Sequence, residues 1–155
     1  MVATVLNRGI SMAPTIINQI VDDSGNRVYH GRVYPGARTI SSETSLILND
    51  LMLETVRSGT CRKTFSGSWK HSVLSRLSIG GKTGSINSRA HDRRYDWFVG
   101  FASEENGSAG LVLSVVVAHG KYIGTRASRY ARWAMEHYFG NYFAKNAAIG
   151  DKADG

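Results

Sequence analysis

Hydrophobic and polar positions in the first sixty residues predict a helix end, a hairpin and a second helix. The turn sequence Asp23-Ser24-Gly25-Asn26 lies between the β-rich residues 15–21 and 27–30, which predicts a short hairpin. Residues 31–39 contain Pro35-Gly36 and are expected to form a connector. Apolar residues at helical spacing then predict a helix over 42–58, which Gly59 would end.

Three apolar segments in the second half predict a sheet. They cover residues 77–85, 97–102 and 111–118, and Asn106-Gly107 between the last two is a strong hairpin signal. Segment 111–118 is apolar at almost every position, which is typical of a central strand covered on both faces. Before the sheet, residues 61–75 are polar and rich in serine. We expect a surface loop there with Trp69 as its main apolar anchor.

A last helix is predicted after Thr125. Its apolar stripe would pack on the sheet and consists of Ala127, Tyr130, Ala131, Ala134 and Tyr138. Residues 147–155 are expected to form a disordered tail. The elements together indicate an α+β fold: an antiparallel sheet of about three strands, plus a small hairpin, packed with helices.

Composition is compatible with a globular domain and narrows its chemistry. The chain has 155 residues, of which 42% are hydrophobic, and its formal net charge of +7 favours anionic partners such as nucleic acid, acidic lipid or a carboxylate-bearing polymer. Cys61 is the single cysteine and the histidines are scattered, so neither an internal disulfide nor a metal site is expected, and no cofactor is implied. The apolar run 111–118 is too short to span a bilayer.

The candidate chemistry lies in the first predicted strand of the sheet. Its run Gly81-Lys82-Thr83-Gly84-Ser85 places a lysine and a hydroxyl side chain between glycines. Glycine in a strand allows close approach of a ligand, and the polar side chains suit a carboxylate or a carbonyl group. This pattern predicts a site for an acyl group.

This run resembles the third motif of the penicillin-binding protein and serine β-lactamase superfamily, whose S-x-x-K, S-x-N and K-T-G elements form an acyl-transfer site. Two flanking stretches are similar to the same family. Val56-Arg57-Ser58-Gly59-Thr60 resembles its V-x-x-G-T stretch, and Trp97-Phe98-Val99-Gly100-Phe101 resembles its W-F-V-G-[YF] strand. The resemblance covers about residues 1–140 and implies that residues 1–146 are the C-terminal part of a transpeptidase domain.

The first two motifs are not matched in this way. No lysine in the chain follows a serine by three positions. Ser85-Ile86-Asn87 spells S-x-N, but it directly follows the lysine motif and would continue the same strand, so we interpret it as a coincidence. The family's sheet has five strands, two of which precede the nucleophile. We therefore expect a chain that is inactive alone, lacks an N-terminal half, and self-associates through an open sheet edge.

The resemblance implies roles for four residues. Lys82 would supply positive charge beside the nucleophilic serine, and Thr83 would bind the carboxylate of a D-Ala-D-Ala stem peptide or of a β-lactam. Gly84 would let the acyl chain lie against the strand. The backbone amide of Ser85 would be one of two oxyanion-hole donors, and its hydroxyl would share the carboxylate. The family also implies an extracytoplasmic, periplasmic location and a tether to the inner membrane through a segment absent here.

Other residues and function classes are weighed against this interpretation. Asp96 is expected to brace the sheet, and the basic loop of Arg89, His91, Arg93 and Arg94 either contacts an anionic partner or is simply solvated. A phosphate-binding loop would require glycine at Arg76. A non-catalytic basic module for nucleic acid or an anionic surface stays an alternative, although no nucleic-acid motif supports it and no nucleic-acid partner is expected.

Overall fold

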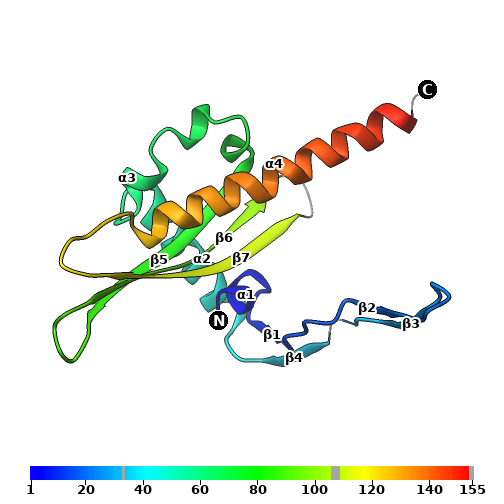
Figure 1. The fold of residues 1–155 in the computed structure, drawn as a ribbon, viewed down its shortest axis with the longest axis horizontal. Coiled ribbons are helices and arrows are strands. Elements are labelled where there is room, and N and C mark those ends of the chain that lie inside the picture. The colour runs from blue at the N-terminus through cyan, green and yellow to red at the C-terminus, as the bar shows by residue number, and fades with distance from the viewer. Residues whose placement is uncertain (33, 106–108, 154–155) are drawn as a thin grey trace. The chain divides into compact units, whose positions relative to one another are not determined.

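The computed structural model describes residues 1–32, 34–105 and 109–153 (Figure 1). They form two compact units, Met1–Asn49 and Asp50–Gly155, and each is described by itself. The boundary falls within helix α2, which runs from Ser42 to Arg57, as the apolar spacing predicted. No helix within the described ranges is both long and apolar enough to cross a membrane.

The first unit contains short elements. They are α1 (Val2–Leu6), β1 (Ile10–Met12), β2 (Gln19–Val21), β3 (Arg27–His30) and β4 (Pro35–Arg38). Strands β2 and β3 form the predicted antiparallel hairpin, which is confirmed. The connector predicted for residues 31–39 is wrong, because it contains β4, which pairs with β1. Pro35 and Gly36 are typical turn residues, and the pairing with β1 depends on backbone hydrogen bonds to a distant segment, which the local sequence does not reveal.

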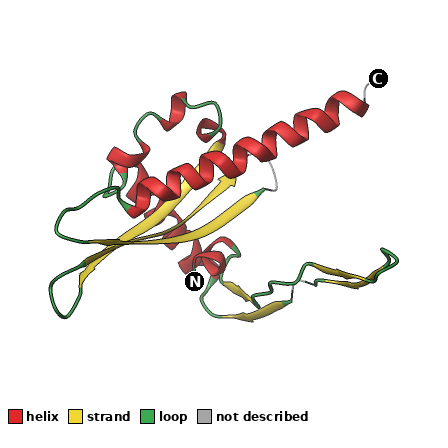
Figure 2. Ribbon diagram, viewed as in Figure 1, coloured by secondary structure: helices red, strands yellow, loops and turns green. Residues whose placement is uncertain are grey.

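The second unit is built on a three-stranded antiparallel sheet. Its strands are β5 (Leu77–Asn87), β6 (Arg94–Glu104) and β7 (Gly110–His119), in the order β5-β6-β7. The long helix α4 (Ala127–Ala153) packs on β6 and β7 (Figure 2). The predicted sheet is confirmed, whereas the tip expected at Asn106-Gly107 lies outside the described residues.

The position of β7 differs from the prediction of a central strand covered on both faces. In the described sheet β6 is central and β7 has one neighbour. Exposed and half-buried residues alternate along β7, and Val112 and Val116 are 42% and 47% exposed. The apolar composition therefore identified the strand, but it did not predict how far its two faces are covered by other elements.

The hydrophobic core lies between the sheet and α4. Phe98 on β6 is fully buried, as are Ala131, Met135 and Phe139 at four-residue spacing on α4. The stripe predicted from sequence is wrong at Tyr130, Ala134 and Tyr138, which are all exposed. Residues four apart share a helix face. Ala127 and Ala131 therefore belong to the buried face, whereas the neighbouring tyrosines do not.

The segment before β5 is a second part of the core and not the predicted surface loop. It contains α3 (Arg62–Phe65) and two 3-10 turns, Ser68–Lys70 and Leu74–Arg76. Cys61, Phe65 and Leu74 are buried, whereas the proposed anchor Trp69 is 63% exposed. Burial raises the pKa of the Cys61 thiol, because the thiolate is poorly solvated there. Cys61 thus serves as a small core residue.

Helix α4 is longer than expected. It extends past Ala147 to Ala153, into the segment for which a disordered tail was predicted. The alanines at 147 and 148 have the highest helix propensity of any residue, so they extend the helix without needing a buried face.

Candidate functional site

Strand β5 holds the candidate motif against β6. The antiparallel register places Thr83 opposite Phe98 and Ser85 opposite Asp96. Because side chains alternate along a strand, Thr83 and Ser85 share the face that carries Phe98 and α4, while Lys82 and Gly84 lie on the other face. The motif therefore presents its hydroxyls and its ammonium group on opposite faces of the strand.

The glycines of β5 have two different roles. A Cβ on Gly81 would overlap the ring of Phe98, and one on Gly80 would lie 2.5 Å from the ring of Phe101. At Gly84 the nearest atom would be Cβ of Trp97 at 3.8 Å, which is ordinary contact. Gly80 and Gly81 are thus required by packing, whereas Gly84 leaves open space on the face of β5 that also carries Lys82.

The polar groups of the motif have defined partners. The hydroxyls of Thr83 and Thr60 are 2.9 Å apart, which ties β5 to the residue that precedes α3. The ammonium group of Lys82 donates to the carbonyl oxygen of Thr83 at 2.6 Å. Thr60 was noted in the sequence only as part of the V-x-x-G-T stretch, and its contact with Thr83 required the fold.

A pocket of about 370 Å³ opens where Thr83 and Ser85 meet α3 and the start of α4. Every lining residue has a polar or charged side chain; the residues are Thr60, Lys63, Thr64, Thr83, Ser85, Asp96, Arg126 and Ser128. Lys82 is not in this lining. Two predicted site residues, Thr83 and Ser85, are therefore brought together with two cations, Lys63 and Arg126, that the sequence did not indicate.

Asp96 organises the inner wall of this pocket. Its side chain is 7% exposed and accepts a hydrogen bond from the backbone N–H of Ala127, at the start of α4, at 2.8 Å. The guanidinium of Arg126 and the Nε2 atom of His119 lie 3.6 Å and 3.8 Å from its carboxylate. Asp96 thus joins β6, β7 and α4, and its predicted role as a brace of the sheet has a structural basis.

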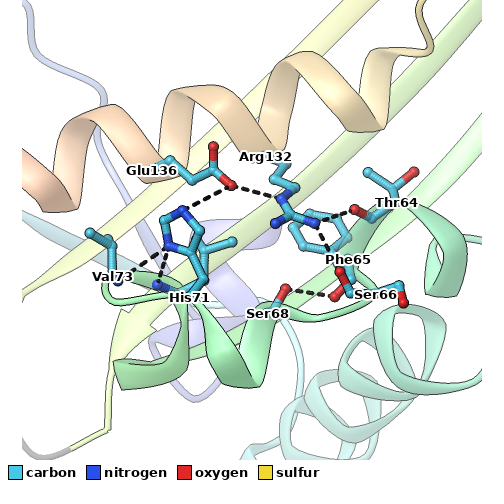
Figure 3. A network of polar contacts seen from close by, with 9 residues as sticks. Thr64, Phe65, Ser66, Ser68, His71, Val73, Arg132 and Glu136 are labelled. Atoms are coloured by element: carbon cyan, nitrogen blue, oxygen red, sulfur yellow. Dashed lines mark hydrogen bonds and ion pairs between the residues drawn. The ribbon is translucent and has the colours of Figure 1, made fainter.

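A second polar network fixes the segment around α3 (Figure 3). Arg132 on α4 donates to the backbone carbonyl oxygens of Thr64 and Ser66, at 2.7 Å and 3.2 Å, and to the carboxylate of Glu136 at 2.7 Å. The same carboxylate lies 3.7 Å from Nε2 of His71. These bonds hold residues 64–66 in place beside the pocket.

The remaining sequence candidates, apart from Ser85, do not line this pocket. Ser85-Ile86-Asn87 continues β5 as predicted. The basic loop between β5 and β6 is exposed, with Arg93 3.9 Å from Asp92. A larger pocket of about 580 Å³ lies beside the start of β5 and α3, with Leu74, Leu77 and Ile79 among its lining, and it contains none of the motif residues.

Comparison with known proteins assigns the fold. A family model described as the penicillin binding protein transpeptidase domain matches residues 1–136. No curated protein sequence matches the chain. The family match covers both compact units and includes the whole of β5, β6 and β7.

Several solved structures share the fold at low identity. Penicillin-binding protein A from M. tuberculosis, as its imipenem acyl-enzyme complex, aligns with a TM-score of 0.67 and 20% identity over 87% of this chain and 28% of that chain. Penicillin-binding protein 2B from Streptococcus pneumoniae strain R6 aligns with a TM-score of 0.65 and 21% identity over 91% and 23%. The D,D-transpeptidase domain of a peptidoglycan glycosyltransferase from Eggerthella lenta aligns with a TM-score of 0.59 and 20% identity over 82% and 27%. The chain spans about a quarter of the length of these structures.

Proposed function

Because the chain belongs to the penicillin-binding protein transpeptidase domain family, we propose that it forms the K-T-G side of a serine acyl-transfer site that cross-links peptidoglycan stem peptides. The observation that carries this proposal is the pocket beside β5, which Thr83 and Ser85 line together. Hydroxyl donors that line a pocket suit a ligand that carries a carboxylate.

Each motif residue has a role that its geometry allows. Thr83 and Ser85 hydrogen-bond the carboxylate of a D-Ala-D-Ala end or of a β-lactam, and Gly84 leaves room for the acyl chain. In the described sheet β5 pairs with β6 alone, so alternate amides along its other edge have no strand partner. The amide of Ser85 serves as one oxyanion-hole donor, a contact worth about 3 kcal/mol in the transition state.

Lys82 acts from the other face of β5. Its ammonium group is exposed and bonded to the carbonyl oxygen of its neighbour Thr83. A positive charge there lowers the energy of a nucleophilic alkoxide that approaches from that side. In the proposed enzyme, Lys82 assists proton transfer at the serine while Thr83 holds the substrate.

The nucleophile is supplied by residues outside this chain. Acyl transfer requires a serine with its own base, and no S-x-x-K occurs in these 155 residues. The chain alone is therefore inactive. The proposed enzyme works in the periplasm and is tethered to the inner membrane.

The missing half also completes the sheet. Strand β7 has one partner within the described part of the chain, and its outer edge carries unpaired backbone groups. Such an edge recruits another strand. We expect it to pair with the N-terminal half of the domain, and a polypeptide restricted to these residues to self-associate through it.

Covalent labelling tests the proposed function. The polypeptide encoded by the whole gene is incubated with a fluorescent penicillin, and the labelled peptide is identified by mass spectrometry. We expect one adduct, on a serine of an S-x-x-K sequence outside these residues, and slower labelling in a Thr83→Val variant than in a Thr15→Val control. An adduct on residues 1–155 would overturn the assignment of the nucleophile, and the absence of any adduct would overturn the transpeptidase proposal.

A further inference from the structure

We propose that Arg126 is the cationic partner of the ligand's carboxylate and thereby determines the preference of this site for anionic acyl donors. The inference rests on the proposed function and assigns a specificity-determining residue to the same pocket. Its basis is the placement of Arg126 in one polar pocket with the hydroxyls of Thr83 and Ser85.

The pocket carries an excess of positive charge. Lys63 and Arg126 face a single carboxylate in the lining, that of Asp96. The other lining residues are hydroxyl side chains, and two pairs of them already bond each other, Thr60 with Thr83 at 2.9 Å and Thr64 with Ser128 at 3.0 Å. A small pocket with hydroxyl donors and net positive charge favours an anion over a neutral group.

Arg126 is held in place by Asp96 but keeps N–H donors that Asp96 does not use. Its guanidinium lies 3.6 Å from the Asp96 carboxylate, which is an ion-pair distance beyond a normal hydrogen bond. The Asp96 oxygen Oδ2 instead accepts the N–H of Ala127 at 2.8 Å. With five N–H donors and 47% of its side chain exposed, Arg126 retains donors for a second carboxylate.

The geometry favours Arg126 over Lys82 for this role. Lys82 alternates to the face of β5 opposite Thr83, and its ammonium group is bonded to a backbone carbonyl oxygen. Arg126 reaches the correct face because Asp96, its ion-pair partner, lies opposite Ser85 in the β5–β6 register. A guanidinium also binds a carboxylate through two parallel bonds, which a lysine does not.

A matched pair of reagents tests the inference. Acylation rate constants of the whole-gene polypeptide are measured with benzylpenicillin and with its neutral methyl ester. We expect Arg126→Gln to lower the rate constant for acylation by benzylpenicillin about tenfold relative to that for the ester, since a hydrogen bond between charged groups is lost. Arg126→Lys should show a smaller loss. Arg129→Gln removes the same charge from α4 outside the pocket lining, and it should keep the wild-type ratio.

Peptide competitors extend the test to the natural class of ligand. A D-Ala-D-Ala peptide with a blocked N-terminus should protect the wild type from penicillin labelling better than the same peptide with a C-terminal amide. Arg126→Gln should reduce that difference in protection. An unchanged penicillin-to-ester ratio in Arg126→Gln would overturn the inference. If both reagents react more slowly by the same factor, Arg126 has a structural role, and if neither reacts more slowly, it has no role in acylation. If neither reagent acylates the wild type, the proposed function itself fails.

Discussion

The two compact units are stabilised in different ways, although one continuous chain builds both. In the second unit, β5, β6 and α4 enclose side chains with no exposed surface, such as Phe98 and Phe139. In the described part of the first unit, Val5 is the buried apolar side chain, and every residue of β2, β3 and β4 is exposed. Burial therefore accounts for the sheet that carries the candidate site, whereas turn chemistry and backbone bonds account for the hairpin.

The largest expected effect of a substitution is at the centre of the second unit. Phe98→Ala should lower the free energy of unfolding by about 3–5 kcal/mol, because it leaves a cavity between β6 and α4. Val28 on β3 is 62% exposed, so Val28→Ala should change stability by less than about 0.5 kcal/mol. Urea unfolding followed by tryptophan fluorescence measures both. Equal losses in the two variants would contradict the contrast between the units.

Two glycines of β5 sharpen the comparison within the second unit. Gly81→Ala should destabilise by about 1–3 kcal/mol, because the new methyl group overlaps the Phe98 ring and lies 3.0 Å from the carbonyl oxygen of Val99. Gly84→Ala is the matched control, with nothing closer than 3.8 Å. Thermal unfolding of the two variants separates packing from strand propensity, and similar melting temperatures would show that Gly81 is not needed for packing.

The sequence predicted the elements of the second unit better than their environments. Residues 77–85 and 97–102 identified β5 and β6, because glycine spacing and apolar runs reflect local geometry. Asp96 gave no indication that it would cap α4, since its partner Ala127 follows thirty-one positions later. The same limit explains the wrong loop at residues 61–75. Its buried side chains pack with those of α4, and Arg132 of α4 bonds its backbone.

The candidate site was predictable to the same extent. The hydroxyls of Thr83 and Ser85 came from a contiguous motif, and the structure places both in one pocket. Lys63 and Arg126 belong to no motif and reach the pocket through α3 and the start of α4. A contiguous motif identifies one wall of a site, whereas the charged groups opposite that wall depend on tertiary packing.

Two aspartates that accept backbone N–H groups extend the comparison to polar interactions. Asp96 is buried, and Asp22 holds the exposed turn between β2 and β3. Asp96→Asn should cost about 1–3 kcal/mol, because the neutral amide binds the N–H of Ala127 more weakly and no longer attracts Arg126. Urea unfolding measures this loss. Asp92 is an exposed aspartate on the β5–β6 loop, and Asp92→Asn should show no comparable change.

The smallest effect is expected in the turn of the first unit and should depend on pH. The side chain of Asp22 accepts the backbone N–H of Asn26 at 2.8 Å and that of Ser24 at 3.0 Å. The bond from Asn26 is the main cause that lowers the pKa of Asp22 below its usual value. A lowered pKa in the folded turn means that the ionised carboxylate stabilises it above the unfolded pKa, about 4. That stabilisation is lost as the pH falls through the lower, folded value.

We therefore expect acid to loosen the β2–β3 turn before it affects the buried sheet. Amide chemical shifts of Ser24 and Asn26, followed by NMR from neutral pH down to about 2, should titrate together with the Asp22 carboxyl group and below the usual aspartate range. Asp22→Asn removes the titrating group and should abolish the shift. A titration of the Ser24 and Asn26 amides that persists in Asp22→Asn would contradict this assignment.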